Sequence, residues 1–264
     1  MAETTHPPIR EDGTDAPLAV VACDVFEAEV RYFLQGQTIP AVVELCLLEM
    51  GLHDRPEQLR ARLQATIDVI EAQTSAQAIV LAYGLCGNGL SGLSAHRCRL
   101  VLPRAHDCIT LLLGSRERYE TLRQAHPDLY WYSPGWNRGG RVPCHEKFER
   151  LREAYAEKFD DTEDIEFLIE TERAALAHVR KAAHVEFPDL GDASDPQWGP
   201  RYTRRCADSM GWDFMHLKGE PQLLQDLLAG RWDRQRFLIV EPGQSIVPVA
   251  HEQIVEARPG KRST

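Results

Sequence analysis

Four residues able to bind a metal ion follow short apolar runs of this sequence. Cys23 ends the first run, and Cys86 lies in a glycine-rich segment after the second. His106 and Cys108 follow the third. Thiolate and imidazole are ligands that Zn²⁺ and Fe²⁺ prefer, and tetrahedral zinc needs three or four of them. Because alternate residues of an extended segment point the same way, His106 and Cys108 can reach one ion together. We therefore expect a transition-metal site at these four residues, with zinc favoured over iron.

The same cysteines have a simpler interpretation as small buried hydrophobic residues, because free cysteine is among the most buried residue types. The sequence contains no C-x-x-C pair, which would be more specific for a metal. The simpler interpretation applies most to Cys23 and least to the pair of His106 and Cys108. The four cysteines that end no predicted strand are not assigned to the site; they are Cys46, Cys98, Cys144 and Cys206.

The glycine-rich segment offers a second kind of site. Residues 87–92 fit G-x-G-x-x-G after a predicted strand, which is the context of dinucleotide binding. However, only seven residues separate this motif from the next predicted strand, and that strand ends in Pro-Arg instead of an acidic ribose ligand. Close backbone packing around Cys86 is therefore favoured, and an anion cradled by backbone N–H groups is the alternative. The cofactor-binding residues of that alternative are Gly87, Asn88, Gly89 and Trp136, the last as an aromatic wall whose other interpretation is core packing.

Two carboxylates are candidate catalytic bases. Asp24 follows Cys23 directly, and Glu241 follows the last apolar run. Either carboxylate would accept a proton beside the metal. The simpler interpretation of Asp24 is that it complements the dipole of the helix that begins there.

These residues depend on a fold that brings their loops together. Continuous apolar runs predict buried strands at Leu18–Cys23, Ala78–Tyr83, Leu100–Pro103, Leu129–Tyr132 and Phe237–Val240. Helical patterns between them indicate βαβ units. We expect an α/β protein with a mostly parallel sheet of about five or six strands flanked by helices, a Rossmann-like three-layer arrangement with a helical insertion. In such a sheet the loops that follow the strands meet at one edge, where ligands bind.

Helical spacing also predicts helices in three other segments. Pro56–Gln73 has the clearest pattern, and Pro40–Met50 is apolar at a similar spacing. Glu146–His184 is highly charged and is expected to be helical, with a break near Asp160 and Asp161.

Changes in composition along the sequence suggest that the chain has four parts. Residues 1–17 are polar and are expected to be a disordered N-terminus. An α/β core is expected at 18–137 plus 201–246, with a charged helical insertion at 138–200. Residues 251–264 are basic and are expected to be a flexible tail.

Composition excludes several classes of function. Forty acidic and thirty basic residues give a formal net charge of −10, so attraction to nucleic acid is not expected. The sequence has neither an apolar signal segment near its start nor a run of about 18 apolar residues, so no membrane span is expected. Seven cysteines without a secretory signal indicate reduced thiols and a cytoplasmic location.

Four segments of the chain resemble the family catalogued as domain of unknown function 1638. They are LAVVACDVF at 18–26, YGLCGNG at 83–89, PRAHDC at 103–108 with the following LLLGS, and SPGW at 133–136. The resemblance covers about 18–137 and 201–246 and treats the segment between as a variable insertion. It implies a setting in corrinoid-linked one-carbon metabolism, with a corrinoid protein or methyltransferase as partner and corrinoid cobalt as an alternative metal.

His106-Asp-Cys108 is also similar to part of the zinc site of methyltransferases related to uroporphyrinogen decarboxylase. In those enzymes a His-x-Cys pair and a distant Cys hold zinc, which activates a thiol to accept a methyl group. Here Cys86 precedes the pair, and the chain is short for an eight-stranded barrel. The similarity is therefore one between sites and not between folds.

Three functions are consistent with these residues. The first is a metal-binding enzyme of one-carbon metabolism that uses a Cys/His-bound metal as a Lewis acid for methyl or other group transfer to a small-molecule substrate. The second is a non-enzymatic protein that handles a metal or corrinoid for a methyltransferase system. The third is a nucleotide-binding oxidoreductase that uses the glycine-rich segment.

Overall fold

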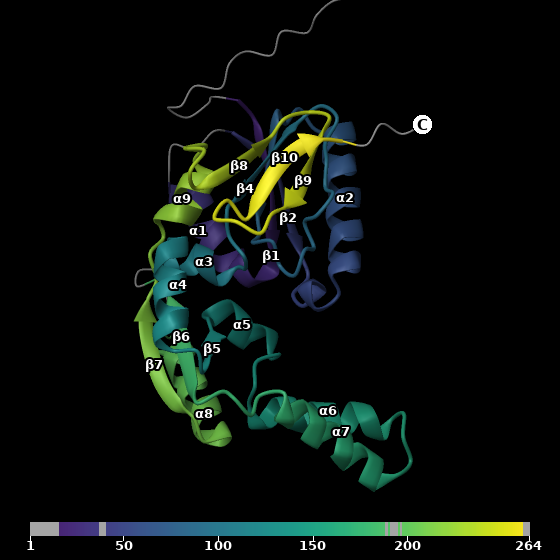
Figure 1. Ribbon diagram of the computed structural model, residues 1–264, viewed down its shortest axis with the longest axis vertical. Coiled ribbons are helices and arrows are strands. Elements are labelled where there is room, and N and C mark those ends of the chain that lie inside the picture. Colours follow the sequence, from purple (N-terminus) through teal and green to yellow (C-terminus); the bar gives the residue numbers. More distant parts are fainter. Residues whose placement is uncertain (1–15, 37–40, 188–189, 191–194, 196, 261–264) are drawn as a thin grey trace, which may run out of the picture. The chain divides into compact units, whose positions relative to one another are not determined.

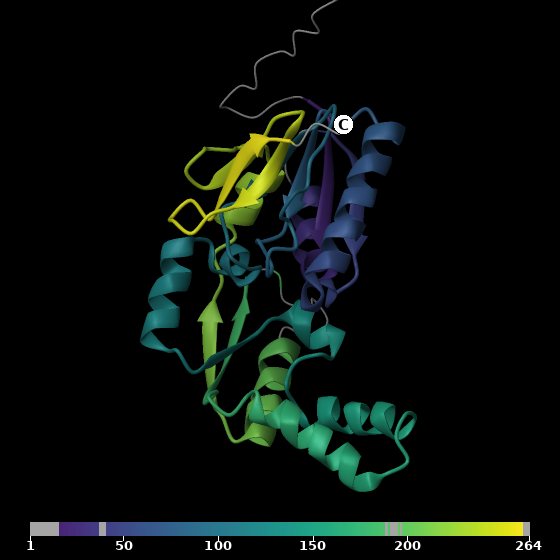
Figure 2. The same cartoon turned by 45° about the vertical axis from the view of Figure 1, so that its right-hand side comes forward.

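The computed structural model describes residues 16–36, 41–187, 190, 195 and 197–260. The chain forms two compact units, drawn in Figures 1 and 2. The first unit comprises Met1–Arg116 and Pro221–Thr264, and the second comprises Glu117–Glu220. The predicted α/β class is confirmed, because each unit combines helices with a sheet of its own.

The first unit is built on a five-stranded sheet with the order β2-β1-β3-β4-β8. The strands are β1 (Leu18–Cys23), β2 (Val42–Leu48), β3 (Ala78–Ala82), β4 (Arg99–Pro103) and β8 (Phe237–Val240). The first four strands are parallel, and β8 pairs antiparallel with β4. The chain winds outward in opposite directions from β1 and β3, so the carboxyl ends of these two strands flank the switch point at which ligands bind in open α/β sheets.

Apolar burial explains the elements of the first unit. From Leu18 to Ala22 every residue of β1 is fully buried, as expected for a strand covered on both faces. α1 (Glu27–Gly36) and α2 (Pro56–Gln73) connect parallel strands in opposite directions across the sheet, so right-handed crossovers place them on opposite faces. The unit also contains α3 (Ile109–Leu113), α9 (Gln222–Leu228) and a hairpin of β9 (Gln244–Pro248) and β10 (Val255–Pro259).

The second unit is built on a parallel three-stranded sheet with the order β5-β6-β7. Its strands are β5 (Leu129–Tyr132), β6 (Lys181–Glu186) and β7 (Asp213–Lys218), and its helices are α4 (Arg116–Ala125), α5 (Pro134–Gly139), α6 (His145–Ala156), α7 (Thr162–Ala174) and α8 (Trp198–Met210). α6 and α7 lie side by side in both views, and Arg152 pairs with Glu166 between them at 2.7 Å.

The prediction of one mostly parallel sheet is only partly right. The five-stranded sheet is mixed, because β8 runs against its neighbour. Leu129–Tyr132, expected in the same sheet, pairs with β6 in the second unit. The segment expected to be a helix near Pro40–Met50 is β2 from Val42 onward; its early part, up to residue 40, lies outside the described residues. A short apolar run does not separate helix from strand by spacing, and pairing with β1 decides for the strand.

The helical expectation for the charged segment is right in its first part and wrong at its end. α6 and α7 are separated near Asp161, which caps α7 by accepting from the N–H of Glu163. Lys181–Glu186, however, is the central strand β6. Its two alanines favour a helix locally, but hydrogen bonding on both sides to β5 and β7 outweighs that preference.

The boundaries between the two units differ from the boundaries expected between the four parts of the chain. The expected insertion at 138–200 lies inside the second unit and supplies its central strand. The expected disordered N-terminus lies outside the described residues except for Ala16 and Pro17. The expected flexible tail contains β10, which pairs with β9, and its residues 261–264 are not described.

Within the described ranges, no helix has both the length and the apolar character needed to cross a membrane. α2, the longest helix of those ranges with 18 residues, mixes charged with apolar side chains.

Two loops at the carboxyl edge of the first sheet lie against each other. The N–H of Leu85 donates to the carbonyl of Ala105 at 2.8 Å, and the N–H of Cys86 donates to that of His106 at 2.9 Å. Gly84 makes this approach feasible, since a Cβ there would lie 2.5 Å from backbone atoms of Asp107. We call these hydrogen bonds and Gly84 the loop clamp.

Gly84→Ala should lower the free energy of unfolding by about 3 kcal/mol, because backbone atoms of Asp107 must move to admit the methyl group. Gly92→Ala is the matched control: Gly92 has a φ of +85° but no atom near its Cβ position, so backbone strain of about 1–2 kcal/mol is the expected cost. Urea unfolding followed by circular dichroism measures both. Equal losses for the two variants would contradict the loop clamp.

Candidate functional site

Three cysteines and a tyrosine gather at the carboxyl edge of the first sheet. Cys23 ends β1, Tyr83 and Cys86 follow β3, and Cys108 is the N-cap of α3. The sulfur atoms of Cys86 and Cys108 are 3.6 Å apart. Cys23 lies near enough to the others that Cys108 contributes to raising its pKa and Cys23 contributes to raising that of Tyr83. We call Cys23, Tyr83, Cys86 and Cys108 the thiol cluster.

Burial favours the protonated form of three members of the thiol cluster. Burial raises the pKa of Cys23 to about 12, and the neighbouring Cys108 adds to the effect. The hydrogen bond with Cys86, followed by burial, raises the pKa of Cys108. Burial and then the three thiols raise the pKa of Tyr83, whose hydroxyl has no hydrogen-bond partner within the described chain. Cys23, Cys108 and Tyr83 therefore hold their protons at neutral pH.

The structure assembles the predicted metal ligands only in part. Cys86 and Cys108 come together, but the side chain of His106 is exposed, and only its carbonyl contacts the cluster through Cys86. The predicted alternation fails because Cys108 has helical backbone angles at the start of α3, so His106 and Cys108 do not share an extended segment.

The two predicted bases lie at opposite ends of the first sheet. Asp24 is exposed and begins a short 3₁₀ helix directly after Cys23. Glu241 follows β8, which is antiparallel, and forms an ion pair with Arg99 at the start of β4 at 2.7 Å. Glu241 is therefore not beside the thiol cluster.

The glycine-rich segment packs closely on α2, in line with the favoured interpretation. A Cβ at Gly89 would lie 2.5 Å from the side chain of Leu59. Gly87 and Asn88 both have positive φ, and the carbonyl of Asn88 accepts from Arg60 at 3.2 Å. Trp136, expected as the wall of the same pocket, belongs to the second unit and packs against that unit's own apolar core.

A different set of ligands lies on the sheet of the second unit. His184 and Glu186 are alternate residues of β6, and His216 is paired with His184 across to β7. His184 Nε2 is 3.1 Å from Glu186 Oε2, and His216 Nε2 is 2.9 Å from Glu186 Oε1. Among the described residues this is the one group of three His, Cys, Asp or Glu ligand atoms that all lie within 4.8 Å of one another. We call it the histidine–glutamate site.

Neighbouring helices fix the ring of His184, which is fully buried. A Cβ at Gly199 in α8 would lie 3.0 Å from this ring, so glycine permits the close approach. Thr203 Oγ1 is 2.8 Å from His184 Nδ1 and accepts from Asn137 Nδ2 at 2.9 Å. The side-chain oxygen of Asn137, Oδ1, is buried and has no hydrogen-bond partner in the part of the chain described. Because Thr203 is bonded to Nδ1 of His184, the other ring nitrogen, Nε2, faces Glu186.

Electrostatics prepare Glu186 to bind a cation. Burial would raise the pKa of Glu186, but its hydrogen bonds to His184 and His216 and their charges lower it below its ordinary value. The carboxylate therefore stays ionised at neutral pH, which is the state that binds a metal.

The sequence contains a pattern that indicates this site, but the segment was expected to be a helix, and in a helix the pattern has no meaning. In a helix the side chains of His184 and Glu186 would point about 160° apart, whereas in a strand they share a face. Ala183 and Val185, on the other face of β6, are fully buried. The alternation in Ala-His-Val-Glu was thus the pattern of a strand that carries two ligands on one face.

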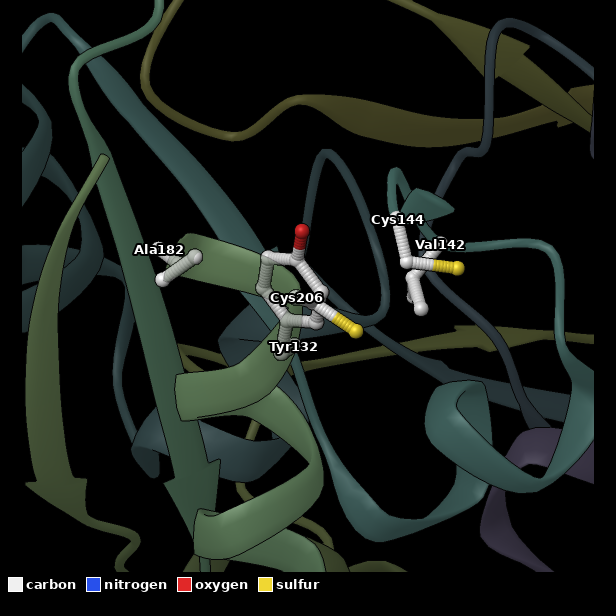
Figure 3. Packing of buried hydrophobic residues seen from close by; sticks show 6 residues of the cluster. Tyr132, Val142, Cys144, Ala182 and Cys206 are labelled. Carbon is white, nitrogen blue, oxygen red and sulfur yellow. The ribbon is translucent and has the colours of Figure 1, made fainter. Parts of the chain in front are cut away.

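A second pair of cysteines lies in the apolar core of the second unit (Figure 3). Cys144 is the N-cap of α6 and accepts from the N–H of Lys147 at 3.3 Å. Hydrogen bonding with Cys206 lowers the pKa of Cys144 and raises that of Cys206. Both thiols are essentially fully buried, so they act as a helix cap and as core side chains.

The family model described as "Protein of unknown function (DUF1638)" matches residues 47–228, which is more than half of the chain. The chain belongs to this family. Within the matched residues lie the histidine–glutamate site, Cys86 and Cys108, whereas Cys23 precedes them. The match also runs through 138–200, the segment expected to be a variable insertion. The chain matches no curated protein and no solved structure.

Tyr83→Phe should leave the free energy of unfolding of this DUF1638 protein unchanged or raise it by up to about 1 kcal/mol, because the buried hydroxyl that it removes has no partner. Tyr132→Phe is the matched control. The hydroxyl of Tyr132 donates to the carbonyl of Pro143 at 2.6 Å, so its loss should cost about 1–2 kcal/mol. Urea unfolding compares the variants, and an equal loss for Tyr83→Phe would mean that its hydroxyl is satisfied.

Proposed function

We propose that this protein is a metal-dependent enzyme that binds one divalent transition-metal ion, with zinc favoured over iron, at the histidine–glutamate site. The observation that carries the proposal is the convergence of two imidazole nitrogens and one carboxylate within 4.8 Å. Two histidines and one carboxylate are a common ligand set of catalytic zinc and of non-haem iron, and they leave coordination positions open. The proposal moves the metal from the cysteines favoured by sequence to ligands that the fold brings together.

The gradient of burial across the site indicates where a substrate would bind. The side chain of His184 is fully buried, that of Glu186 is 15% exposed and that of His216 is 48% exposed. An ion held by all three would therefore keep its open positions on the side of His216. A small molecule could reach the ion there.

The chemistry proposed is that of a Lewis acid. A metal ion with open positions polarises a bound carbonyl or lowers the pKa of a bound water or thiol. Methyl or other group transfer is the proposed reaction class. The proposed setting in corrinoid-linked one-carbon metabolism, with a corrinoid protein or methyltransferase as partner, rests on resemblance in sequence. Seven free cysteines support a cytoplasmic location, where thiols stay reduced.

Metal titration of the metal-free chain tests the proposal. The wild type should bind about one equivalent of Zn²⁺, and His184→Ala and His216→Ala should each weaken binding by at least about 100-fold, since each removes one of three ligands. Competition with a chromophoric chelator measures the affinity, and the d–d spectrum of Co²⁺ reports the ligand type. His53→Ala is the matched control, because His53 is exposed and pairs only with the neighbouring Asp54.

Two results would overturn the assignment. One is unchanged zinc affinity in both histidine variants. The other is loss of binding in His106→Ala or Cys108→Ser together with sulfur-to-cobalt charge-transfer bands, which would place the metal at the set predicted from sequence. A site that binds zinc but has no open position, seen as Co²⁺ that no added anion perturbs, would favour the non-enzymatic alternative.

Thr203→Val should weaken zinc binding by about 10- to 100-fold without unfolding the second unit, because Thr203 orients the ring of His184. Thr171→Val serves as the control, since Thr171 bonds only to the carbonyl of Phe167 on the exposed surface of α7. The same chelator competition measures both variants. Equal affinities would show that Thr203 does not position the ligand.

A further inference from the structure

We propose that Cys86 and Cys108 form a redox-active dithiol that exchanges with low-molecular-weight disulfides. This site belongs to the first unit and is independent of the histidine–glutamate site. The two sulfur atoms already lie 3.6 Å apart in the thiol state. A disulfide bond is about 2.05 Å long, so modest side-chain rotation closes the remaining gap.

The loop clamp holds the loops that carry the two cysteines against each other. The N–H of Cys86 is bonded to the carbonyl of His106, two residues before Cys108. Gly84, which precedes Cys86 by two residues, lies against the backbone of Asp107, which precedes Cys108 by one. Both loops are thus fixed beside their cysteines.

The strained backbone of Cys86 indicates a functional role for its side chain. Its φ is +47°, a left-handed conformation that is strained for a residue with a Cβ. Glycine would adopt this conformation without that strain, as the following Gly87 does at +63°. Strain of this kind in a non-glycine residue clusters at functional positions.

Contact between the sulfur atoms distinguishes this pair. Cys86 is 9% exposed and Cys108 8%, close to the 7% of Cys23, whereas Cys98 and Cys144 are fully buried. What sets the pair apart from Cys23 is the 3.6 Å between its two sulfur atoms. Cys108 begins α3, whereas Cys86 lies in the glycine-rich loop, so Cys86 is the sulfur assigned to attack first.

The exchange balances with the small disulfide as the oxidant. Cys86 gives its proton to water, and its thiolate attacks a disulfide R–S–S–R, forming a Cys86–S–S–R bond and releasing one R–S⁻. That thiolate takes the proton of Cys108, and the Cys108 sulfur attacks the sulfur of Cys86 and releases the second R–S⁻, which takes a proton from water. The sum is two protein thiols and one R–S–S–R giving one protein disulfide and two R–SH.

A buried polar group lies near this pair. Only 3% of Tyr83 is exposed, and its hydroxyl has no hydrogen-bond partner among the described residues, although Cys23, Cys108 and Cys86 all contribute to the rise of its pKa.

Disulfide mapping on the full-length protein tests the proposal. The reduced chain is incubated with excess oxidised glutathione, alkylated and digested with trypsin. Cys86 then lies in the peptide of residues 63–97 and Cys108 in that of residues 105–116. We expect these two peptides to be linked, titratable thiols to fall from seven to five per chain, and a reductant to restore all seven with an unchanged circular dichroism spectrum.

Variants fix the assignment. Cys86→Ser and Cys108→Ser should each abolish the link, and Cys98→Ser, the matched buried control, should retain it. The mapping of the wild type does not depend on either variant folding. Seven alkylated thiols after oxidation, a glutathione adduct on Cys86 that never passes to Cys108, or a link from Cys23 in place of one of the pair would each overturn the proposal.

Discussion

Parallel pairing of neighbouring strands is the constraint on which both candidate sites depend. In the first unit it brings the carboxyl ends of β1, β3 and β4 to one edge, so three loops distant in sequence carry their cysteines to one place. In the second unit it aligns His184 with His216 in register. The antiparallel β8 shows the converse, because its reversal carries Glu241 to the opposite end of the sheet.

Each site contains a buried polar atom that has no hydrogen-bond partner among the described residues. The hydroxyl of Tyr83 lies among the thiols, and the amide oxygen of Asn137 lies one hydrogen bond beyond the residue that orients His184. Each such atom costs about 1–3 kcal/mol of stability. Together with the left-handed backbone of Cys86, these costs fall at the two sites, where function and stability are expected to conflict.

The sequence predicted those parts of the fold that are determined by burial alone. β1, β3, β4 and β8 are continuous apolar runs, and α2 shows its apolar spacing clearly, so each was recognisable. β2 and β6 were not, because Val42–Leu48 is too short to reveal its period and the alanines of β6 suit a helix. Their state is decided by hydrogen bonds to strands far away in sequence. The candidate sites divide in the same way: Cys86 and Cys108 follow from strand ends, whereas His184 and Glu186 share a face only once β6 is known to be a strand.

The protonation of the ligands argues for which site would hold a metal. A thiol binds a metal as thiolate, and Cys23, with a pKa raised to about 12, must lose its proton at a cost about 4 kcal/mol greater than that of a free thiol. Cys108 faces the same opposition, since its hydrogen bond to Cys86 and its burial favour the thiol. Glu186 has the reverse balance, because its histidine neighbours keep it ionised. The second unit thus presents a charged carboxylate between two imidazoles, whereas Cys23 and Cys108 in the first unit resist the loss of proton that metal binding requires.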